Sequence, residues 1–413
     1  MSSAEQEAKN LLAKIERIVD RAFCEMLLRQ LEAHEAPIEV KALSIRPATN
    51  KGDNYTSDMF RVSLEYVSGG REKKTSLVVK SEPLTDGIHK DMISRSTLFS
   101  TEIRMMSDSL TKMNGFLAPG QKLNGRGLYT QKKNPPMLVI EDLQPLGFRM
   151  ADRESGLDYP HCLLAIKGLA RFHASSVALC EKEPEQKDWY RRGIFVNQPD
   201  EVKQFFTQGA RSLAQEAANW PELDQRIVEK IGRIADDIYE RGSGVSDCRS
   251  HEFNVINHGD FWVNNMLFKY DANNRPIGHI FVDFQLSLYS SPAVDLQYFF
   301  NTSLSDDMLL AKESALLEAY LAELEAVMKA AGCRTRAPSM AELQRMMRER
   351  ATYGMVAAFT VLPLVLVEKS EVKSLDEMMS SDGTYDNPAY RGKAYRKAMV
   401  RRLPKFDQLG LLD

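Results

Sequence analysis

The chain has 413 residues, with 54 Lys and Arg against 57 Asp and Glu, and 43% of its residues are hydrophobic. This length exceeds what one compact core usually takes, so we expect two lobes around a cleft. The near-balanced charge argues against nucleic acid as a partner, and the ordinary hydrophobic content argues against a disordered or fibrous chain.

Cysteine spacing and apolar runs indicate the compartment. The five cysteines are far apart and never in a C-x-x-C arrangement, so neither disulfides nor a zinc site is predicted. The N-terminus has no signal-peptide pattern, and the longest apolar run, 355–367, contains Pro363 and is short for a membrane span. We expect a cytosolic protein with reduced thiols and no membrane partner.

The first third of the chain predicts lead-in helices and a small antiparallel sheet. Apolar residues recur at helical spacing over 1–37. The period then changes to that of strands, and Gly69 and Gly70 mark a hairpin turn. A helix is expected at 96–110. The expected strands are 38–45, 59–67, 74–82, 126–131 and 137–142. A first lobe, 38–142, follows from this pattern.

The remainder, 143–413, predicts a mainly helical lobe. The strongest helical patterns are 163–180, 227–242 ended by Gly242, and 306–332. One strand pair, 265–270 and 278–284, interrupts them, and 368–387 has the composition of an exposed loop. The fold class is therefore α+β, with a small sheet lobe and a large helical lobe.

The stretch INHGDFWVNNMLF at 256–268 carries the clearest chemical pattern. Asp260 is followed five positions later by Asn265, the spacing of a phosphoryl-transfer loop in which the acid is the base and the amide binds Mg²⁺. The strand pair after it leads to Asp283, a second acid suited to hold the metal. His258 and Asp295 are expected to support the loop by hydrogen bonds, whereas His173 fits a buried core histidine.

The first lobe supplies residues that would bind ATP. Lys80 ends an apolar strand, from which its ammonium can reach phosphates, and Glu102 on the next helix can pair with it. Backbone N–H groups of the turn at 52–66 can cover the phosphates, although Gly52 stands where protein kinases have three glycines. The further cofactor-binding candidates are Asn54 and Ser57 in this turn, and Glu141 and Leu143, whose main chain can contact adenine.

The order of these motifs resembles a known family. NHGDFWVNNMLFKY and PIGHIFVDFQLSLYSSPAVDLQYFF, together with LVIEDL and LARFHASS, look like the signature of insect ecdysteroid kinase-like proteins, which are related to choline and aminoglycoside kinases. The resemblance implies a two-lobed protein-kinase-like fold, ATP and Mg²⁺ as cofactors, and phosphate transfer to a hydroxyl of a small molecule such as an ecdysteroid. It implies the same roles for Asp260, Asn265, Asp283, Lys80 and Glu102.

Other functions stay open on the sequence alone. The acceptor site is expected to be built mainly from residues after the hinge strand (137–143) and from the helical region around 185–250. The acceptor can instead be choline, ethanolamine or a xenobiotic alcohol, because a match at the ATP end says little about the acceptor end. A quaternary ammonium would need an aromatic and acidic cage, and a sterol an apolar cleft. The alternative outside enzymes is a nucleotide-binding pseudokinase scaffold, and it is disfavoured because the lysine, the glutamate, the base and the metal ligands are all present. Trp262 is a candidate wall of the acceptor pocket or a packing residue.

Overall fold

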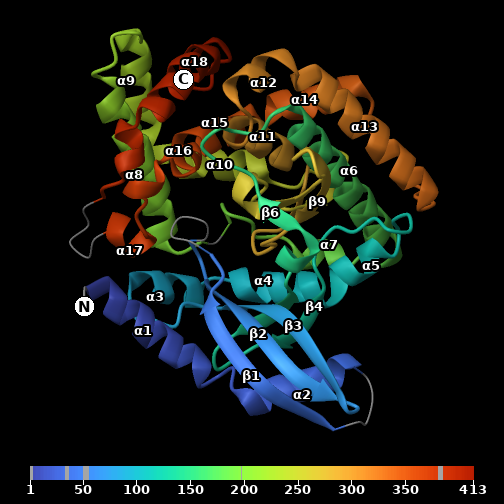
Figure 1. Ribbon diagram of the computed structural model, residues 1–413. Helices are drawn as coiled ribbons and strands as arrows, with labels where there is room; N and C mark the ends of the chain where they lie inside the picture. The colour runs from blue at the N-terminus through green and yellow to red at the C-terminus, as the bar shows by residue number, and fades with distance from the viewer. Residues whose placement is uncertain (1–2, 33–36, 50–54, 197, 380–384) are drawn as a thin grey trace.

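The computed structural model describes residues 3–32, 37–49, 55–196, 198–379 and 385–413. They form a smaller N-terminal lobe and a larger, mainly helical lobe, as Figure 1 shows. The N-terminal lobe consists of α1 (Ser3–Glu16), α2 (Arg21–Glu32), β1 (Ile38–Pro47), β2 (Asp58–Ser68), β3 (Arg71–Ser81), α3 (Ile88–Arg95), α4 (Leu98–Arg104), the π-helical η1 (Met105–Ser109), α5 (Leu110–Asn114), β4 (Gly127–Gln131) and β5 (Met137–Glu141).

The N-terminal sheet is antiparallel throughout, with strand order β1-β2-β3-β5-β4. All five strands expected from the sequence are confirmed, and Gly69 and Gly70 turn the β2–β3 hairpin with φ of 56° and 75°, which glycine adopts without strain. Val19 and Leu27 of the lead-in segment share a buried cluster with Val62 and Val79 of the sheet. The lead-in helices therefore belong to the core of this lobe.

The larger lobe begins with strands and long helices around the predicted catalytic loop. Its first half consists of η2 (Gln144–Leu146), β6 (Phe148–Met150), α6 (Tyr159–Lys182), α7 (Gln186–Trp189), α8 (Asp200–Ala217), α9 (Gln225–Ile234), η3 (Ala235–Asp237), α10 (Ile238–Ser246), β7 (Val255–Asn257), η4 (Val263–Asn265), β8 (Met266–Tyr270), β9 (Pro276–Phe281) and β10 (Leu288–Ser290). Small antiparallel sheets, β6-β8-β9 and β10-β7, hold the loop between them.

Helices complete this lobe. They are α11 (Ala293–Thr302), α12 (Asp306–Ala311), α13 (Glu313–Ala330), α14 (Met340–Glu349), α15 (Ala351–Thr360), α16 (Leu362–Leu366), η5 (Lys369–Glu371), α17 (Leu375–Met378), η6 (Pro388–Arg391) and α18 (Lys393–Gln408). By length and composition α6 could cross a membrane, but 78% of its most apolar window is buried in the protein. It packs against α13, so it is a core helix here.

Three sequence expectations are wrong in detail. The helix expected at 227–242 breaks into α9, η3 and α10, and Gly242 lies inside α10, where a Cβ atom would come within 2.7 Å of the Phe195 ring. The helix expected at 306–332 breaks at Lys312, whose φ of −130° is not helical. The loop expected at 368–387 contains the short helix α17, whose Met378 is only 1% exposed, whereas residues 368–371 before this helix are exposed as expected.

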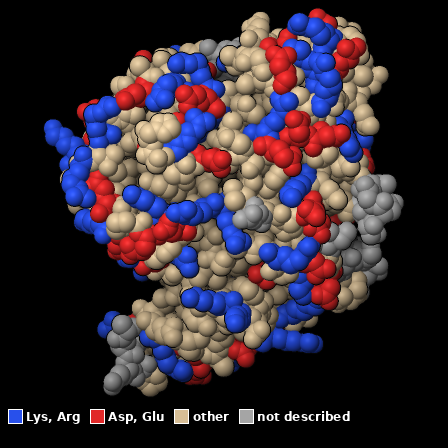
Figure 2. All heavy atoms as spheres, turned by 180° about the vertical axis from the view of Figure 1, so that it is seen from behind, with Lys and Arg blue, Asp and Glu red and all other residues tan. Residues whose placement is uncertain are grey.

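Charged side chains of both signs are interspersed on the face seen from behind in Figure 2, over both lobes. The surface is hollowed on one side where the smaller lobe meets the larger one. Between the lobes, α17 contacts α3, so a short helix of the large lobe reaches the N-terminal lobe beside the cleft. Leu375 of α17 lines the same pocket as Asp260 of the predicted site.

Candidate active site

The segment after β7 is held rigidly from two sides. The Asp295 carboxylate, on α11, accepts hydrogen bonds from the backbone N–H of His258 at 2.6 Å and of Gly259 at 2.8 Å. Gly259 has φ of 81°, and a Cβ atom there would lie 1.8 Å from the carbonyl oxygen of Leu286. Only glycine allows this approach. The loop carrying Asp260 is therefore locked against the segment that follows Asp283.

The Asp260 carboxylate is oriented by two donors. Asn265 Nδ2 donates to Asp260 Oδ2 at 2.9 Å, and the Tyr298 hydroxyl donates to Asp260 Oδ1 at 2.6 Å. Burial raises the pKa of Asp260 to about 7, and the negative charge of Asp283 acts in the same direction. A carboxylate with a pKa near neutrality is suited to accept a proton from a hydroxyl group.

Lys80 joins the two lobes through two carboxylates. Its Nζ lies 2.7 Å from Glu102 Oε2 and 2.9 Å from Asp283 Oδ1, and the Lys80 and Glu102 side chains are each 2% exposed. Burial opposes the charge of Lys80, but the charges of Asp283 and Glu102 outweigh it and hold the lysine pKa above its ordinary value. The ammonium is thus charged and fixed in position between the two lobes.

Asn265 and Asp283 have the chemistry of a magnesium site. Carboxylate and amide oxygens are ligands that Mg²⁺ binds in phosphoryl-transfer sites. Asn265 Nδ2 donates a hydrogen bond to Asp260, which fixes the side-chain amide group. The backbone carbonyl of Asn265 accepts a hydrogen bond from the backbone N–H of Val282 at 3.1 Å, next to Asp283. No cluster of three or more His, Cys, Asp or Glu that could hold a metal occurs within the described residues. The metal roles of Asn265 and Asp283 stay predictions, and the residues fit them.

The remaining ATP-binding candidates are only partly described. Gly52 and Asn54 lie outside the described residues, and Ser57 immediately precedes β2. The Glu141 N–H donates to the Arg126 carbonyl at 2.9 Å, and the Leu143 carbonyl accepts from two N–H groups of the turn after it. An adenine contact of this segment stays a prediction, and it would use main-chain groups other than these two.

The buried histidines are structural neighbours of the loop. His258 Nε2 lies 3.0 Å from the Val282 carbonyl oxygen. His173 lies between Tyr320 and Asp295, at 2.8 and 3.1 Å, and is fully buried. Burial lowers the pKa of both histidines. Both histidines are therefore neutral, and their contacts stabilise the loop and the position of Asp295.

Three contacts of the site were not predicted from the sequence. The Tyr298 hydroxyl donates a hydrogen bond to Asp260. Gln285 Nε2 donates to Thr56 Oγ1 at 2.7 Å, and Asp142 accepts a hydrogen bond from Arg61 Nε at 2.8 Å. The signal for Tyr298 was present, because it follows Asp295 by three positions on one helix and therefore shares its face. The other two contacts join segments far apart in the chain, and no local spacing indicates them.

A pocket of about 150 Å³ opens beside Asp260, and we call it the acceptor pocket. Aliphatic and aromatic side chains from both lobes make up most of its wall, and Asp260 is the one charged residue among the described residues that line it. The lining comprises Tyr55, Thr56, Met92, Ile93, Ser96, Leu98, Ile194, Gln198, Val202, Phe205, Phe206, Asp260, Trp262, Gln285, Leu286, Tyr298, Val361, Leu364, Leu375 and Met379. The region near 185–250 thus contributes, together with α3, α16 and α17.

A family model described as the ecdysteroid kinase-like family matches residues 51–333. The chain belongs to this family. Like the family, it is a small-molecule kinase, a phosphotransferase with an alcohol group as acceptor. The lysine, the glutamate and the Asp-Asn loop described above all fall inside the matched range.

Solved structures and curated proteins were compared as well. An ethanolamine kinase from Plasmodium vivax is 14% identical, with 89% of this chain and 84% of that chain covered and a TM-score of 0.46. A choline/ethanolamine kinase family protein from Mesorhizobium loti is 12% identical, with coverages of 94% and 98% and a TM-score of 0.42. The amicoumacin kinase hAmiN, in complex with AMP-PNP, Ca²⁺ and Ami, is 12% identical, with coverages of 88% and 87% and a TM-score of 0.40. No curated protein matches significantly.

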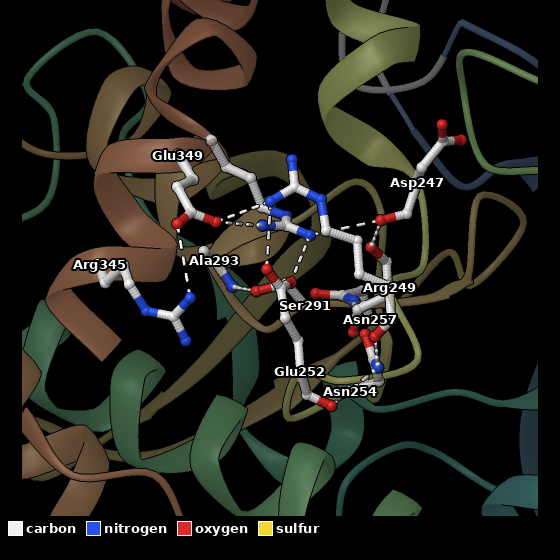
Figure 3. A network of polar contacts seen from close by, with 11 residues as sticks. Asp247, Arg249, Glu252, Asn254, Asn257, Ser291, Ala293, Arg345 and Glu349 are labelled. Carbon is white, nitrogen blue, oxygen red and sulfur yellow. Dashed lines mark hydrogen bonds and ion pairs between the residues drawn. The ribbon is translucent and has the colours of Figure 1, made fainter. Parts of the chain in front are cut away.

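In this ecdysteroid kinase-like chain a partly buried polar network supports the strand that precedes the predicted catalytic loop (Figure 3). Glu252 forms ion pairs with Arg350 Nη2 at 2.7 Å and with Arg249 Nη1 at 3.2 Å. Arg249 Nη1 forms a further ion pair with Glu349 at 2.7 Å. Asn257, at the end of β7, donates to the carbonyls of β10. The network therefore ties the segment before β7 to the end of α14.

Replacing Glu252 by glutamine should lower the free energy of unfolding by about 3 kcal/mol, because the fully buried Arg350 would lose its closest charge partner and keep only Glu349 at 3.9 Å. Chemical denaturation measures this change. The control is Glu222→Gln, which breaks an exposed ion pair with Arg396 and should cost less than about 1 kcal/mol. Equal losses in the two variants would mean that this polar network does not hold this segment.

Proposed function

We propose that the chain transfers the γ-phosphate of ATP to a hydroxyl group of an apolar small molecule, with ecdysteroids as the first candidates and Asp260 as general base. One observation carries this proposal: the acceptor pocket is apolar and opens beside an aspartate whose pKa is about 7. Membership of the ecdysteroid kinase-like family supports the same reaction class.

Each residue would act by position and charge. Asp260 would hold the acceptor hydroxyl and take its proton as the oxygen attacks phosphorus, and Lys80 would anchor phosphate oxygens. Asn265 and Asp283 would hold Mg²⁺, which neutralises charge on the phosphates when bound. Glu102 keeps Lys80 in place. Tyr298 and Asn265 keep the Asp260 carboxylate facing the pocket.

A choline or ethanolamine acceptor is the second candidate. Aromatic residues in the pocket wall favour it, since they can bind an ammonium group by cation–π contact. Against it, the described residues of the wall offer no carboxylate besides Asp260, which the reaction would need for itself. The volume of about 150 Å³ is below the roughly 300–1,000 Å³ of common ligand pockets. A sterol therefore requires the walls to move apart, and a test panel must span several sizes.

The protein incubated with Mg-ATP and a panel of ecdysteroids, plant phenolics, choline and ethanolamine tests this function. Mass spectrometry should find phosphorylated products of apolar alcohols. Phosphocholine or phosphoethanolamine as the sole product would overturn the acceptor class. ATP binding without any product across the panel would favour the pseudokinase scaffold.

The pH dependence should report the state of Asp260. The base acts when deprotonated, so kcat/KM should rise with pH through about 7, the pKa of Asp260. Replacing Tyr298 by phenylalanine removes a hydrogen bond that lowers this pKa, so the rise should move to higher pH. Initial rates between about pH 5 and 9 measure both curves. Identical profiles for the two proteins would show that another group controls the rate.

A further inference from the structure

Two side chains that line the acceptor pocket each have a buried polar atom without a hydrogen-bond partner among the described residues. Trp262 is 6% exposed and Gln285 is 3% exposed, and both line the pocket. The indole Nε1 of Trp262 and the amide Oε1 of Gln285 bond no other group among the described residues. Of the described side chains with such a buried atom, these are the two that line the pocket.

Such atoms lower the stability of the folded protein unless a ligand forms the missing hydrogen bonds. A buried donor or acceptor without a partner costs about 1–3 kcal/mol, and most buried polar groups in native proteins are paired. Apolar side chains of similar shape would have filled these two positions without that cost. Aliphatic and aromatic side chains make up most of the rest of the wall, so the unpaired indole and amide are candidate recognition groups.

We infer that Trp262 and Gln285 form a polar subsite that binds hydroxyl groups of the acceptor other than the one that is phosphorylated. The inference rests on the proposed function. An indole N–H only donates, and an amide oxygen only accepts. A hydroxyl group can do both, so the acceptor class is an apolar frame with two or more hydroxyl groups.

Both residues of the subsite follow, along the chain, an aspartate to which we assign a role in the reaction. Trp262 follows Asp260 by two residues, and Gln285 follows Asp283 by two residues. Gln285 is held by its bond to Thr56 Oγ1 at 2.7 Å, which fixes the amide between the lobes. A monoalcohol leaves the buried groups unpaired, and sites built to bond a hydroxyl reject analogues that lack it.

A matched pair of small acceptors tests the subsite: phenethyl alcohol, with one hydroxyl group, and phenylethylene glycol, with two. The readout is the ratio of kcat/KM for the diol to that for the monoalcohol with Mg-ATP. Trp262→Phe keeps an aromatic ring and removes the N–H, so this ratio should fall about tenfold. Trp189→Phe removes an indole outside the pocket and should leave the ratio as in the wild type.

A second pair of variants separates the amide oxygen from its anchoring bond. Gln285→Met and Thr56→Val both break the Gln285–Thr56 bond, but only the first removes Oε1. The diol preference should fall in Gln285→Met and persist in Thr56→Val. Thermal denaturation of each variant checks that it folds, and the two pairs are independent, so one misfolded variant does not remove the test.

The outcomes separate the subsite from the kinase function. If the wild type phosphorylates both alcohols without preference, or if Trp262→Phe keeps the preference, the subsite is overturned while the kinase stands. If the wild type phosphorylates neither, calorimetric binding of the two alcohols to wild type and Trp262→Phe decides instead. Tighter binding of the diol that is lost in the variant supports the subsite, and equal binding overturns it.

Discussion

Replacing Asp260 by asparagine should leave a protein that folds and binds ATP but transfers phosphate about a thousandfold more slowly, in the range general bases contribute. Asparagine has nearly the same shape and can still meet the Tyr298 hydroxyl and the Asn265 amide. It cannot take the proton from the acceptor hydroxyl. Initial rates with saturating Mg-ATP and the best acceptor of the panel measure the effect, and calorimetry measures ATP binding.

The control for this charge change is Asp236→Asn, because that aspartate is exposed and pairs with Arg211 on the surface. Its rate should equal that of the wild type. If Asp260→Asn keeps a rate within about tenfold of the wild type, the base contributes less than general bases do, and positioning by Lys80 and the metal ligands carries the reaction. Loss of ATP binding in Asp260→Asn would instead indicate a disturbed cleft.

The parts of the fold that could be predicted are those specified by local sequence. The strands of the N-terminal sheet were found because period-two patterns with β-branched residues have few other solutions, and the glycine pair at 69–70 marks one turn. The predicted end of a helix was wrong where a glycine is needed for packing rather than for ending the helix. Gly242 looked like a helix end, but its missing side chain makes room for Phe195, which is 47 positions away in the sequence.

The candidate site also has a part that local sequence indicates and a part that only the folded chain brings together. Asp260 and Asn265 were recognisable because both lie on one short loop, and their contact at 2.9 Å is local. The acceptor pocket was not, since its wall gathers side chains from α3, α8, α16 and α17. Tertiary packing decides which apolar faces meet, and a single sequence does not encode that in any spacing. The helix α17 inside the loop expected at 368–387 was missed for this reason, because it is short and packs against α3 of the other lobe.

The second large effect concerns Lys80. Replacing it by methionine should reduce kcat/KM for ATP by about 10- to 100-fold, because a charge-assisted hydrogen bond contributes roughly 1.5–3 kcal/mol. The same change should lower the free energy of unfolding by about 3–5 kcal/mol, because Glu102 would stay buried without a cation. Lys74→Met, on the same strand but 79% exposed, is the control and should change neither quantity measurably.

A double variant separates the two roles of Lys80. Lys80→Met combined with Glu102→Met removes both charges of this buried pair, and replacing such a pair by apolar side chains of similar volume is often without cost to stability. We therefore expect the double variant to regain much of the lost free energy of unfolding, measured by chemical denaturation, while kcat/KM for ATP stays as low as in Lys80→Met. Recovery of activity along with stability would contradict the phosphate-anchor role, since the lysine would then act only by holding the lobes together. Low activity in a stable protein would leave the contact between the ammonium and the phosphates as the cause of the loss.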